Sequence, residues 1–349
     1  MKKHILPFRL LSIFLVLIIS VGMLNSCGKA LAYDRYDYDL NEYINTGDLS
    51  QIEVSAKEVE TAVMNSVNSI AWNNSLYTEL TDGTVQTYDV LVVDFTCAID
   101  GLAIDAFASK DAKIYVGSGS MIEGFEEGLI GMAVGDEPRV MTLTFPEEYH
   151  SDLGGKEAVY TVTLKKISRP HEITDELVRK YTDYDTLSEM KEVISKLRTA
   201  EIAFNIIYER TEVKKYPETE YKYYHDDVAY LETYAKEQKM TVEEFLSKYG
   251  DQFSEFGFYK GMTEAEYKEE CDAYAKRNVK EQMIVYYVLR ELNVKTTGKP
   301  YNDMKKRILR DYNMSNKANY EEVYGEGSLD SGIRYNLMLN ALYDRVVTK

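Results

Sequence analysis

The chain has 349 residues, of which 45% are hydrophobic and 28% are charged. This composition is typical of folded proteins, and the length suits two or three domains. Its 41 Lys and Arg residues face 58 Asp and Glu residues, so the formal net charge is −17. Such an excess of acid argues against a nucleic-acid partner, because phosphate binding requires clustered Lys and Arg.

The chain contains only three cysteines and four histidines. Cys97 falls on a predicted buried strand and Cys271 on a predicted helix of another domain, so both are expected to be buried small side chains rather than a redox pair. No CxxC motif and no spacing typical of metal ligands occurs. The sequence therefore predicts no metal site and no other cofactor.

Residues 1–26 have the pattern of an export signal. Basic residues precede a fifteen-residue apolar run from Leu10 to Leu24, which is short for a membrane-spanning helix and typical of a signal peptide. The run ends at Leu24-Asn25-Ser26-Cys27, which resembles the lipobox of bacterial lipoproteins, where the cysteine receives diacylglycerol. We therefore expect lipidation at Cys27. The alternative is an ordinary signal peptide with an incidental cysteine, or an uncleaved anchor.

Two short segments follow the signal. Residues 27–49 are acidic, rich in tyrosine and without a clear period, and they are predicted to be a tether to the membrane. Residues 50–85 are predicted to form a short strand and a helix. Ser55 and Glu58 have the spacing of a capping box, and the helix carries apolar residues at helical spacing, namely Val59, Val63, Val67 and Ile70.

Residues 86–169 alternate between apolar strand-like runs and turns. The segment MIEGFEEGLIGMAVGD at 121–136 predicts one short helix, and strands are predicted on either side of it. Together with FPEEYH at 145–150 and GKEAVYTVTLKKI at 155–167, this order of motifs resembles the FKBP family of prolyl isomerases, and most of all the version found in trigger factor. The resemblance implies an α+β fold, a twisted antiparallel sheet wrapped on a short helix.

The resemblance also implies a set of site residues. Asp105 and Tyr149 correspond to the catalytic positions, the acid and the loop tyrosine of the pocket. Ile104 stands where the family usually has Phe, and Phe107 is close enough in sequence to supply that ring. The implied substrate-binding residues are apolar or aromatic: Phe95, Ile104, Phe107, Met121, Ile122, Phe125 and Tyr160. Taken singly, Phe95, Ile122 and Phe125 would be interpreted as ordinary core residues, and Asp105 and Tyr149 as an ordinary loop acid and tyrosine, so the assignment depends on their order and spacing.

Residues 170–349 are predicted to be helical throughout. Thr186 and Glu189 form a second capping-box pattern, Pro217 begins another helix, and a long helix is expected from Thr263 to Leu292. This succession resembles the C-terminal domain of trigger factor. Six tyrosines between positions 216 and 234 are consistent either with a solvated helix that partly buries its tyrosines or with a cradle for client proteins.

These observations lead to one hypothesis and one alternative. The first is an exported, lipid-anchored peptidyl-prolyl cis-trans isomerase and folding chaperone. Its partners would be unfolded, newly exported, proline-containing polypeptides, and the membrane through its lipid, with no nucleic acid and no ribosome. The alternative is a non-catalytic holdase or surface-binding lipoprotein that retains the FKBP fold.

Overall fold

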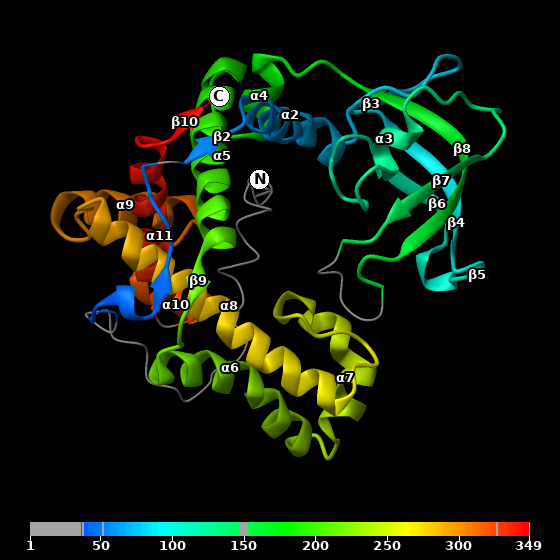
Figure 1. Ribbon diagram of the computed structural model, residues 1–349. Coiled ribbons are helices and arrows are strands. Elements are labelled where there is room, and N and C mark those ends of the chain that lie inside the picture. Colours follow the sequence, from blue (N-terminus) through cyan, green and yellow to red (C-terminus); the bar gives the residue numbers. More distant parts are fainter. Residues whose placement is uncertain (1–35, 37, 51, 147–152, 326, 349) are drawn as a thin grey trace, which may run out of the picture. The chain divides into compact units, whose positions relative to one another are not determined.

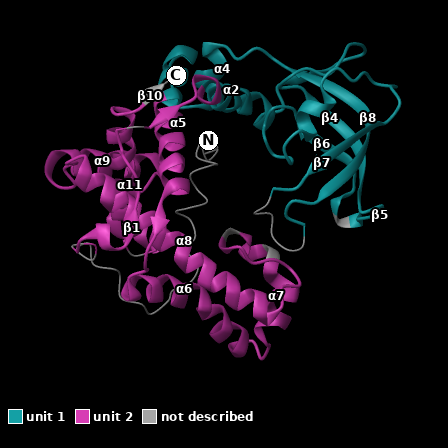
Figure 2. Cartoon of the chain, viewed as in Figure 1, with its two compact units in different colours: residues 1–10, 60–195 teal, residues 11–59, 196–349 magenta. Residues whose placement is uncertain are grey.

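The computed structural model describes residues 36, 38–50, 52–146, 153–325 and 327–348 (Figure 1). The chain divides into two compact units (Figure 2). In the described part, the first unit comprises residues 60–195 and the second comprises the residues up to 59 together with 196–349. The predicted signal peptide, Cys27 and Tyr149 lie outside the described residues. Where the chain is described, no helix is both long and apolar enough to span a bilayer.

The first unit is built on a six-stranded antiparallel sheet. Its strands are β3 (Tyr77–Glu79), β4 (Val90–Ile99), β5 (Leu102–Ala103), β6 (Ser109–Tyr115), β7 (Arg139–Thr144) and β8 (Glu157–Pro170). The two long strands, β4 and β8, pair with each other along their length. β6 and β5 also pair with β4, and β7 and β3 also pair with β8.

The burial pattern of strand β8 shows why this sequence forms a sheet with one face on a core. Ala158, Tyr160, Val162 and Leu164 are buried in strict alternation, as expected when one face of a sheet covers a core. The register of β8 against β4 then shifts beside Val92 and Val93, and the phase changes so that Ile167 is buried. The irregularity thus keeps apolar side chains facing the core along the whole strand.

A single short helix, α3 (Phe125–Leu129), covers the core side of the sheet (Figure 1). Phe125 and Leu129 have no exposed surface and belong to the same apolar core as β4 and β8. Helix and sheet approach closely at Gly128, where a Cβ would lie 2.2 Å from the sulfur of Met141 on β7 and would displace that side chain. The predicted fold of this unit is therefore confirmed.

Helix α2 (Ala56–Asn73) precedes the sheet and packs through the predicted stripe, since Val59, Val63, Val67 and Ile70 are all buried. The hydroxyl of Ser55 accepts a hydrogen bond from the Glu58 amide at 3.4 Å, as the cap pattern predicts. Near its end, the indole N–H of Trp72 donates to the carbonyl oxygen of Tyr88 at 3.1 Å. The helix is thereby attached to the start of β4.

The second unit is mostly helical. Helices α4 (Asp175–Tyr181) and α5 (Leu187–Arg210) lead into it from the first unit. The helices that follow are α6 (Glu218–Glu237), α7 (Val242–Tyr249), η4 (Gly250–Phe256), α8 (Glu264–Glu291), α9 (Gly298–Asp311), α10 (Lys317–Tyr324) and α11 (Ser328–Tyr343). Capping boxes begin α7 at Thr241 and α8 at Thr263. Helices α6 and α8 pack together, and the Tyr267 hydroxyl donates to the Val228 carbonyl at 3.0 Å.

Contrary to the sequence prediction, residues 170–349 are not helical throughout. The helix that starts after Thr186 ends at Arg210, and Glu212–Val213 then form strand β9. The last two helices, α10 and α11, are separated by a segment that contains Gly325 and Gly327, and α11 begins at Ser328. Cys97 on β4 and Cys271 on α8 are both buried and free, as predicted.

The predicted tether differs from the structure in its described part. Tyr36, Leu40 and Ile44 are buried, and the Tyr36 ring stacks on that of Tyr286 at 4.6 Å. A short helix, η2 (Leu40–Glu42), leads to β1 (Ile44–Asn45), which pairs antiparallel with β9. Further on, β2 (Glu53–Val54) pairs with β10 (Val347–Thr348). The segment therefore belongs to the helical unit, because its side chains and backbone contact residues far along the chain.

Candidate functional site

Three aromatic rings from three elements form the base of the candidate site. Phe95 on β4 lies 5.5 Å from Phe125 at the start of α3, and Phe125 lies 5.3 Å from Tyr160 on β8 at an interplanar angle of 90°. Edge-to-face contacts of this kind are favourable because ring edges are positive and ring faces negative. Phe125 and Tyr160 are 0% and 3% exposed, so both rings lie beneath the surface of the site. The Phe95 ring is half-buried and is therefore partly exposed at that surface.

The other predicted apolar residues surround this base. Ile104, Phe107, Met121 and Ile122 are half-buried and pack against the same core. Phe107 lies on the short helix η3 (Asp105–Phe107), and its ring is 5.3 Å from that of Phe145. An aromatic ring therefore stands close to Ile104. The structure thus brings the seven predicted apolar residues to one core.

The two predicted catalytic residues have different outcomes. Asp105 begins η3, its side chain is exposed, and its carboxylate has no hydrogen bond or ion pair within the described part of the chain. Such a carboxylate is available to a ligand. Tyr149 lies outside the described residues, so its predicted role stays a prediction.

Glu126 is a residue of this region that the sequence reasoning missed. Its side chain is 3% exposed and accepts hydrogen bonds from the amides of Gly117 (2.7 Å), Gly119 (3.1 Å), Ser120 (2.9 Å) and Met121 (3.2 Å). The hydroxyls of both loop serines, Ser118 and Ser120, donate to it as well.

This carboxylate therefore fixes the loop 117–121, which leads directly to Met121 and Ile122. The sequence signal for this role is limited to the pair of acids that follows Phe125. A five-residue helix has too few turns for the sequence pattern to show which of Glu126 and Glu127 faces inward.

The ends of α3 are held by two further features. Gly124 has φ +86°, and a Cβ there would lie 3.1 Å from a methyl group of Leu143. At the other end, the Arg139 guanidinium donates to the carbonyl oxygens of Gly128 (2.7 Å) and Ile130 (3.2 Å). These bonds satisfy carbonyls that a helix end leaves without partners. The ring of Phe125 is thus placed from both sides.

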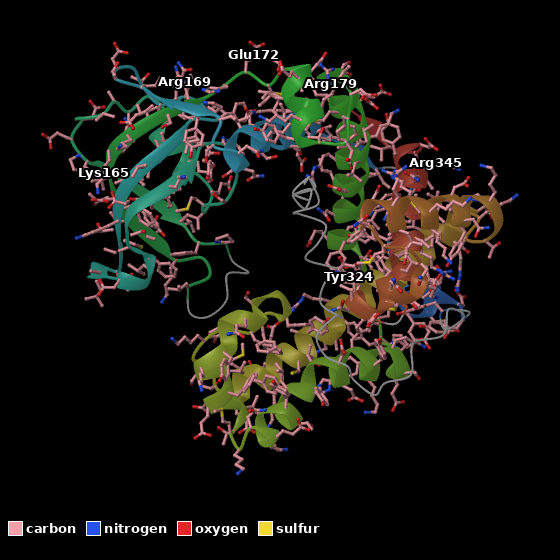
Figure 3. All side chains as sticks on the ribbon, turned by 180° about the vertical axis from the view of Figure 1, so that it is seen from behind. Lys165, Arg169, Glu172, Arg179, Tyr324 and Arg345 are labelled. Carbon is pink, nitrogen blue, oxygen red and sulfur yellow. The ribbon has the colours of Figure 1, made fainter. Side chains whose placement is uncertain are left out.

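An ion pair between a buried carboxylate and a partly exposed guanidinium joins the two long strands. The Arg169 guanidinium, labelled in Figure 3, donates to both carboxylate oxygens of Asp89 at 2.9 and 2.8 Å, and the Asp89 side chain is 1% exposed. Asp89 also accepts from the Gln86 amide at 2.8 Å. The pairing locks the start of β4 to the end of β8, because a two-point contact restricts orientation as well as distance.

Among the described residues of this site, the cysteine is held in a form that disfavours reaction. The Cys97 thiol contacts Tyr160 within the core, and burial raises its pKa, although the hydrogen bond with Tyr160 acts in the opposite direction. Raising the pKa reduces the thiolate fraction on which cysteine reactivity depends. The arrangement is suited to binding an apolar group beside one carboxylate.

This fold and this site define a protein that joins an FKBP-type domain to a helical domain. The family model "FKBP-type peptidyl-prolyl cis-trans isomerase" matches residues 81–165, and the model "Bacterial trigger factor protein (TF) C-terminus" matches residues 231–348. The chain therefore combines an FKBP domain with a trigger factor C-terminal helical domain, and the recognition made from its sequence is confirmed.

Similarity to whole trigger factors extends over both parts. The trigger factor of Pelotomaculum thermopropionicum is 28% identical over 79% of this chain and 63% of its own length. That of Trichlorobacter lovleyi is 36% identical over 40% of this chain and 32% of its own length. A solved structure of the trigger factor chaperone aligns with 87% of this chain and 72% of its own at 16% identity, with a TM-score of only 0.30. The chain thus spans less than two thirds of the first of these relatives.

Proposed function

We propose that this chain is a folding chaperone with FKBP-type peptidyl-prolyl cis-trans isomerase activity. The observation that carries the proposal is the aromatic base of Phe95, Phe125 and Tyr160, ringed by half-buried apolar residues in a domain that matches the FKBP family model. A proline ring is a compact apolar group, and such a surface removes it from water.

The chemistry required is modest. Rotation about an X-Pro bond has a barrier of roughly 18–20 kcal/mol, because the C–N bond is partly double. The twisted amide has lost resonance and some charge separation, so an apolar surface favours it over the planar ground state. The Phe95 ring would hold the proline, and the Asp105 carboxylate would orient or polarise the twisted amide beside it.

The helical unit would hold the client while the first unit samples its prolines. Support comes from the match to the trigger factor C-terminal model and from the tyrosine-rich helix α6. Tyrosine offers a large apolar face and a polar tip, which suits contacts with varied sequences. Linking the two activities raises the effective concentration of prolines near the isomerase site.

We further propose that the protein acts outside the cytoplasm, anchored by lipid on Cys27, where it meets exported chains rather than ribosomes. The support is the sequence pattern of residues 1–27. Cys27→Ser should release the protein from membranes or leave its signal uncleaved, as cell fractionation would reveal. A variant that is still processed and membrane-bound would contradict lipidation.

A proline-limited peptide assay on the full chain tests the isomerase proposal. Asp105→Asn keeps the side-chain shape and removes the charge, so it should slow catalysis roughly three- to tenfold, the equivalent of about 0.7–1.4 kcal/mol. Asp82→Asn, at another exposed position of the same unit, is the matched control and should have no effect. Ile104, where the family usually has Phe, favours the alternative, a non-catalytic holdase. If that alternative is correct, the parent protein itself would not accelerate isomerisation of the peptide above its spontaneous rate.

A further inference from the structure

The helical unit carries a concentration of basic residues that neither the isomerase site nor the holding of clients uses. Residues 295–310 contain six Lys or Arg residues and one acid, in a chain whose formal net charge is −17. Most of this segment is helix α9, which packs on α11 (Figure 1). Its Met304 and Ile308 are each 7% exposed. The helix therefore buries one apolar face in its unit and leaves the opposite face to solvent.

The exposed face of α9 is basic. Lys299, Lys306 and Arg310 are spaced by seven and then four residues, which places them on one face of a helix. The side chains of Lys299 and Arg310 are 88% and 74% exposed, and Lys306 is exposed as well. Arg307, on the same side of the helix, is 52% exposed. These bases form a stripe that extends about 16 Å along the helix axis.

Two acids of α9 offset part of this positive charge. The Lys299 ammonium lies 2.5 Å from Asp303, and Asp311 lies 3.1 Å from Arg310 and 3.7 Å from Arg307. Exposed ion pairs of this kind are weak and are easily exchanged for other partners. Five bases face two acids along the helix, so it keeps a surplus of positive charge.

The N-terminal segment would keep this unit close to the bilayer that carries the lipid. Tyr36 is 4% exposed and stacks on Tyr286 of the helical unit at 4.6 Å. It follows the proposed lipid site, Cys27, by nine residues, and a chain of that length spans at most about 32 Å. Whenever Cys27 is anchored, the helical unit therefore lies near the lipid headgroups, and one of its surfaces faces them.

We propose that the basic face of α9, formed by Lys299, Lys306, Arg307 and Arg310, docks on the anionic headgroups of the membrane that carries the anchor. The inference rests on the proposed lipidation of Cys27. Anionic headgroups attract each nearby Lys or Arg, and the attraction acts within a Debye length of about 8 Å. The same headgroups repel the acidic remainder of the chain, so the favoured orientation turns α9 toward the bilayer. Long flexible side chains also suit a fluid layer of headgroups, which requires no fixed geometry.

The test measures whether a bilayer covers α9. The full chain, isolated from cell membranes, is inserted into vesicles of phosphatidylcholine alone or of phosphatidylcholine mixed with anionic phosphatidylglycerol. Its lysines are acetylated with a membrane-impermeant reagent and quantified by mass spectrometry. At low salt, Lys299 and Lys306 should react about five- to tenfold more slowly on the anionic vesicles, relative to the exposed Lys239 of the same unit. High salt should abolish the difference, because it screens the attraction.

A double variant tests the face itself. Lys306→Gln with Arg310→Gln removes two of its bases, so Lys299 should react on anionic vesicles almost as fast as on neutral ones. Lys236→Gln with Lys268→Gln, at two exposed positions elsewhere in the unit, is the matched control and should leave Lys299 protected.

The outcomes separate the docking from the anchor. If Lys299 and Lys306 react equally on both kinds of vesicle, or if the first double variant keeps Lys299 protected, the docking is wrong while the anchor stands. Equal protection on neutral and anionic vesicles would indicate that a protein surface covers α9, and it would contradict the docking as well. If the full chain carries no lipid and is not retained on vesicles, the anchor is wrong and the docking is overturned with it.

Discussion

The sheet unit saturates both of its buried carboxyl groups, whereas the helical unit pairs Glu201 and Asp330 but leaves two other carboxyl groups without partners among the described residues. In the sheet unit, Glu126 accepts six hydrogen bonds from one loop, and Asp89 forms a two-point ion pair with Arg169. In the helical unit, Asp227 on α6 is 6% exposed and Glu281 on α8 is half-buried, and neither has a hydrogen bond or ion pair among the described residues.

The difference indicates different tasks. Saturated buried polar groups stiffen their surroundings and specify one arrangement, which suits a site that must hold a loop in place. Unpaired buried carboxyls cost stability and shift toward the neutral form instead. Burial alone raises the pKa of both Asp227 and Glu281 to about 7. The stability of the helical unit is therefore expected to change with pH.

The largest effect is expected from removing the carboxylate that holds the loop of the isomerase-type site. Glu126→Ala leaves four loop amides and two hydroxyls without their acceptor, and should destabilise the sheet unit by about 3–5 kcal/mol. Trp72 is the single tryptophan of the chain and contacts Tyr88 and Tyr115 in this unit, so its fluorescence during unfolding measures the loss.

The neighbouring Glu127→Ala, at an exposed position of the same helix, is the control and should change stability little. Equal melting of the two variants would show that the loop does not depend on Glu126.

The next effect concerns the ion pair between the long strands. Arg169→Met leaves the Asp89 carboxylate buried without its cation, and should cost about 2–4 kcal/mol, a figure reduced because Arg169 is itself 37% exposed. Urea unfolding followed at Trp72 gives the value. Lys166→Met removes an exposed cation from the same strand and serves for comparison.

Adding Asp89→Asn to the Arg169→Met variant removes the stranded charge and should recover part of the loss. If it recovers nothing, the buried charge is not the cause.

The stability of the helical unit should depend on pH in a way that distinguishes it from the sheet unit. The pKa of Asp227 is near 4 when unfolded and about 7 when folded, so the folded state holds an extra proton between these values. The stability that this group contributes is therefore fully present below pH 4 and is lost as the pH rises to 7, by about 4 kcal/mol in total, of which about 2–3 kcal/mol is lost between pH 5 and pH 8. Far-UV circular dichroism of the helices should show melting temperatures that fall from pH 5 to pH 8.

Asp227→Asn should flatten much of that dependence, and Asp226→Asn, at the exposed neighbouring position, should leave it intact. A helical transition that is independent of pH in the parent protein would contradict the contrast between the units.

Much of the fold could be predicted from sequence because its signals are local. The alternation along β8, the stripe of α2 and the cap patterns at Ser55 and Thr186 all depend on residues within one element or next to it. The packing of Tyr36 and of the segment from Tyr38 to Ile44 could not be predicted, because its contacts are with distant residues. Ile44 pairs with Val213, and Tyr36 stacks on Tyr286. Nothing in an aperiodic acidic segment identifies partners so far along the chain.

The candidate site shows the same limit. Its apolar residues could be named because the resemblance fixes their order, and the structure brings them to one core. Glu126 was missed because its partners are backbone amides of a loop, which any sequence supplies. Asp227 was missed because nothing in the pattern of α6 distinguishes a buried carboxyl from its exposed neighbour Asp226.

The smallest effect should come from a single hydroxyl in the Glu126 network. Ser118→Ala removes one donor at 3.0 Å and leaves the four amides in place, so it should cost only about 0.5–1.5 kcal/mol and leave the rate of prolyl isomerisation nearly unchanged. Thermal unfolding at Trp72 and the proline peptide assay measure the two quantities. The contrast between the units depends on this redundancy, because a saturated carboxylate tolerates the loss of one partner. A loss as large as that of Glu126→Ala would show that the network is held by one bond, and the sheet unit would then be no more securely fixed than the helical one.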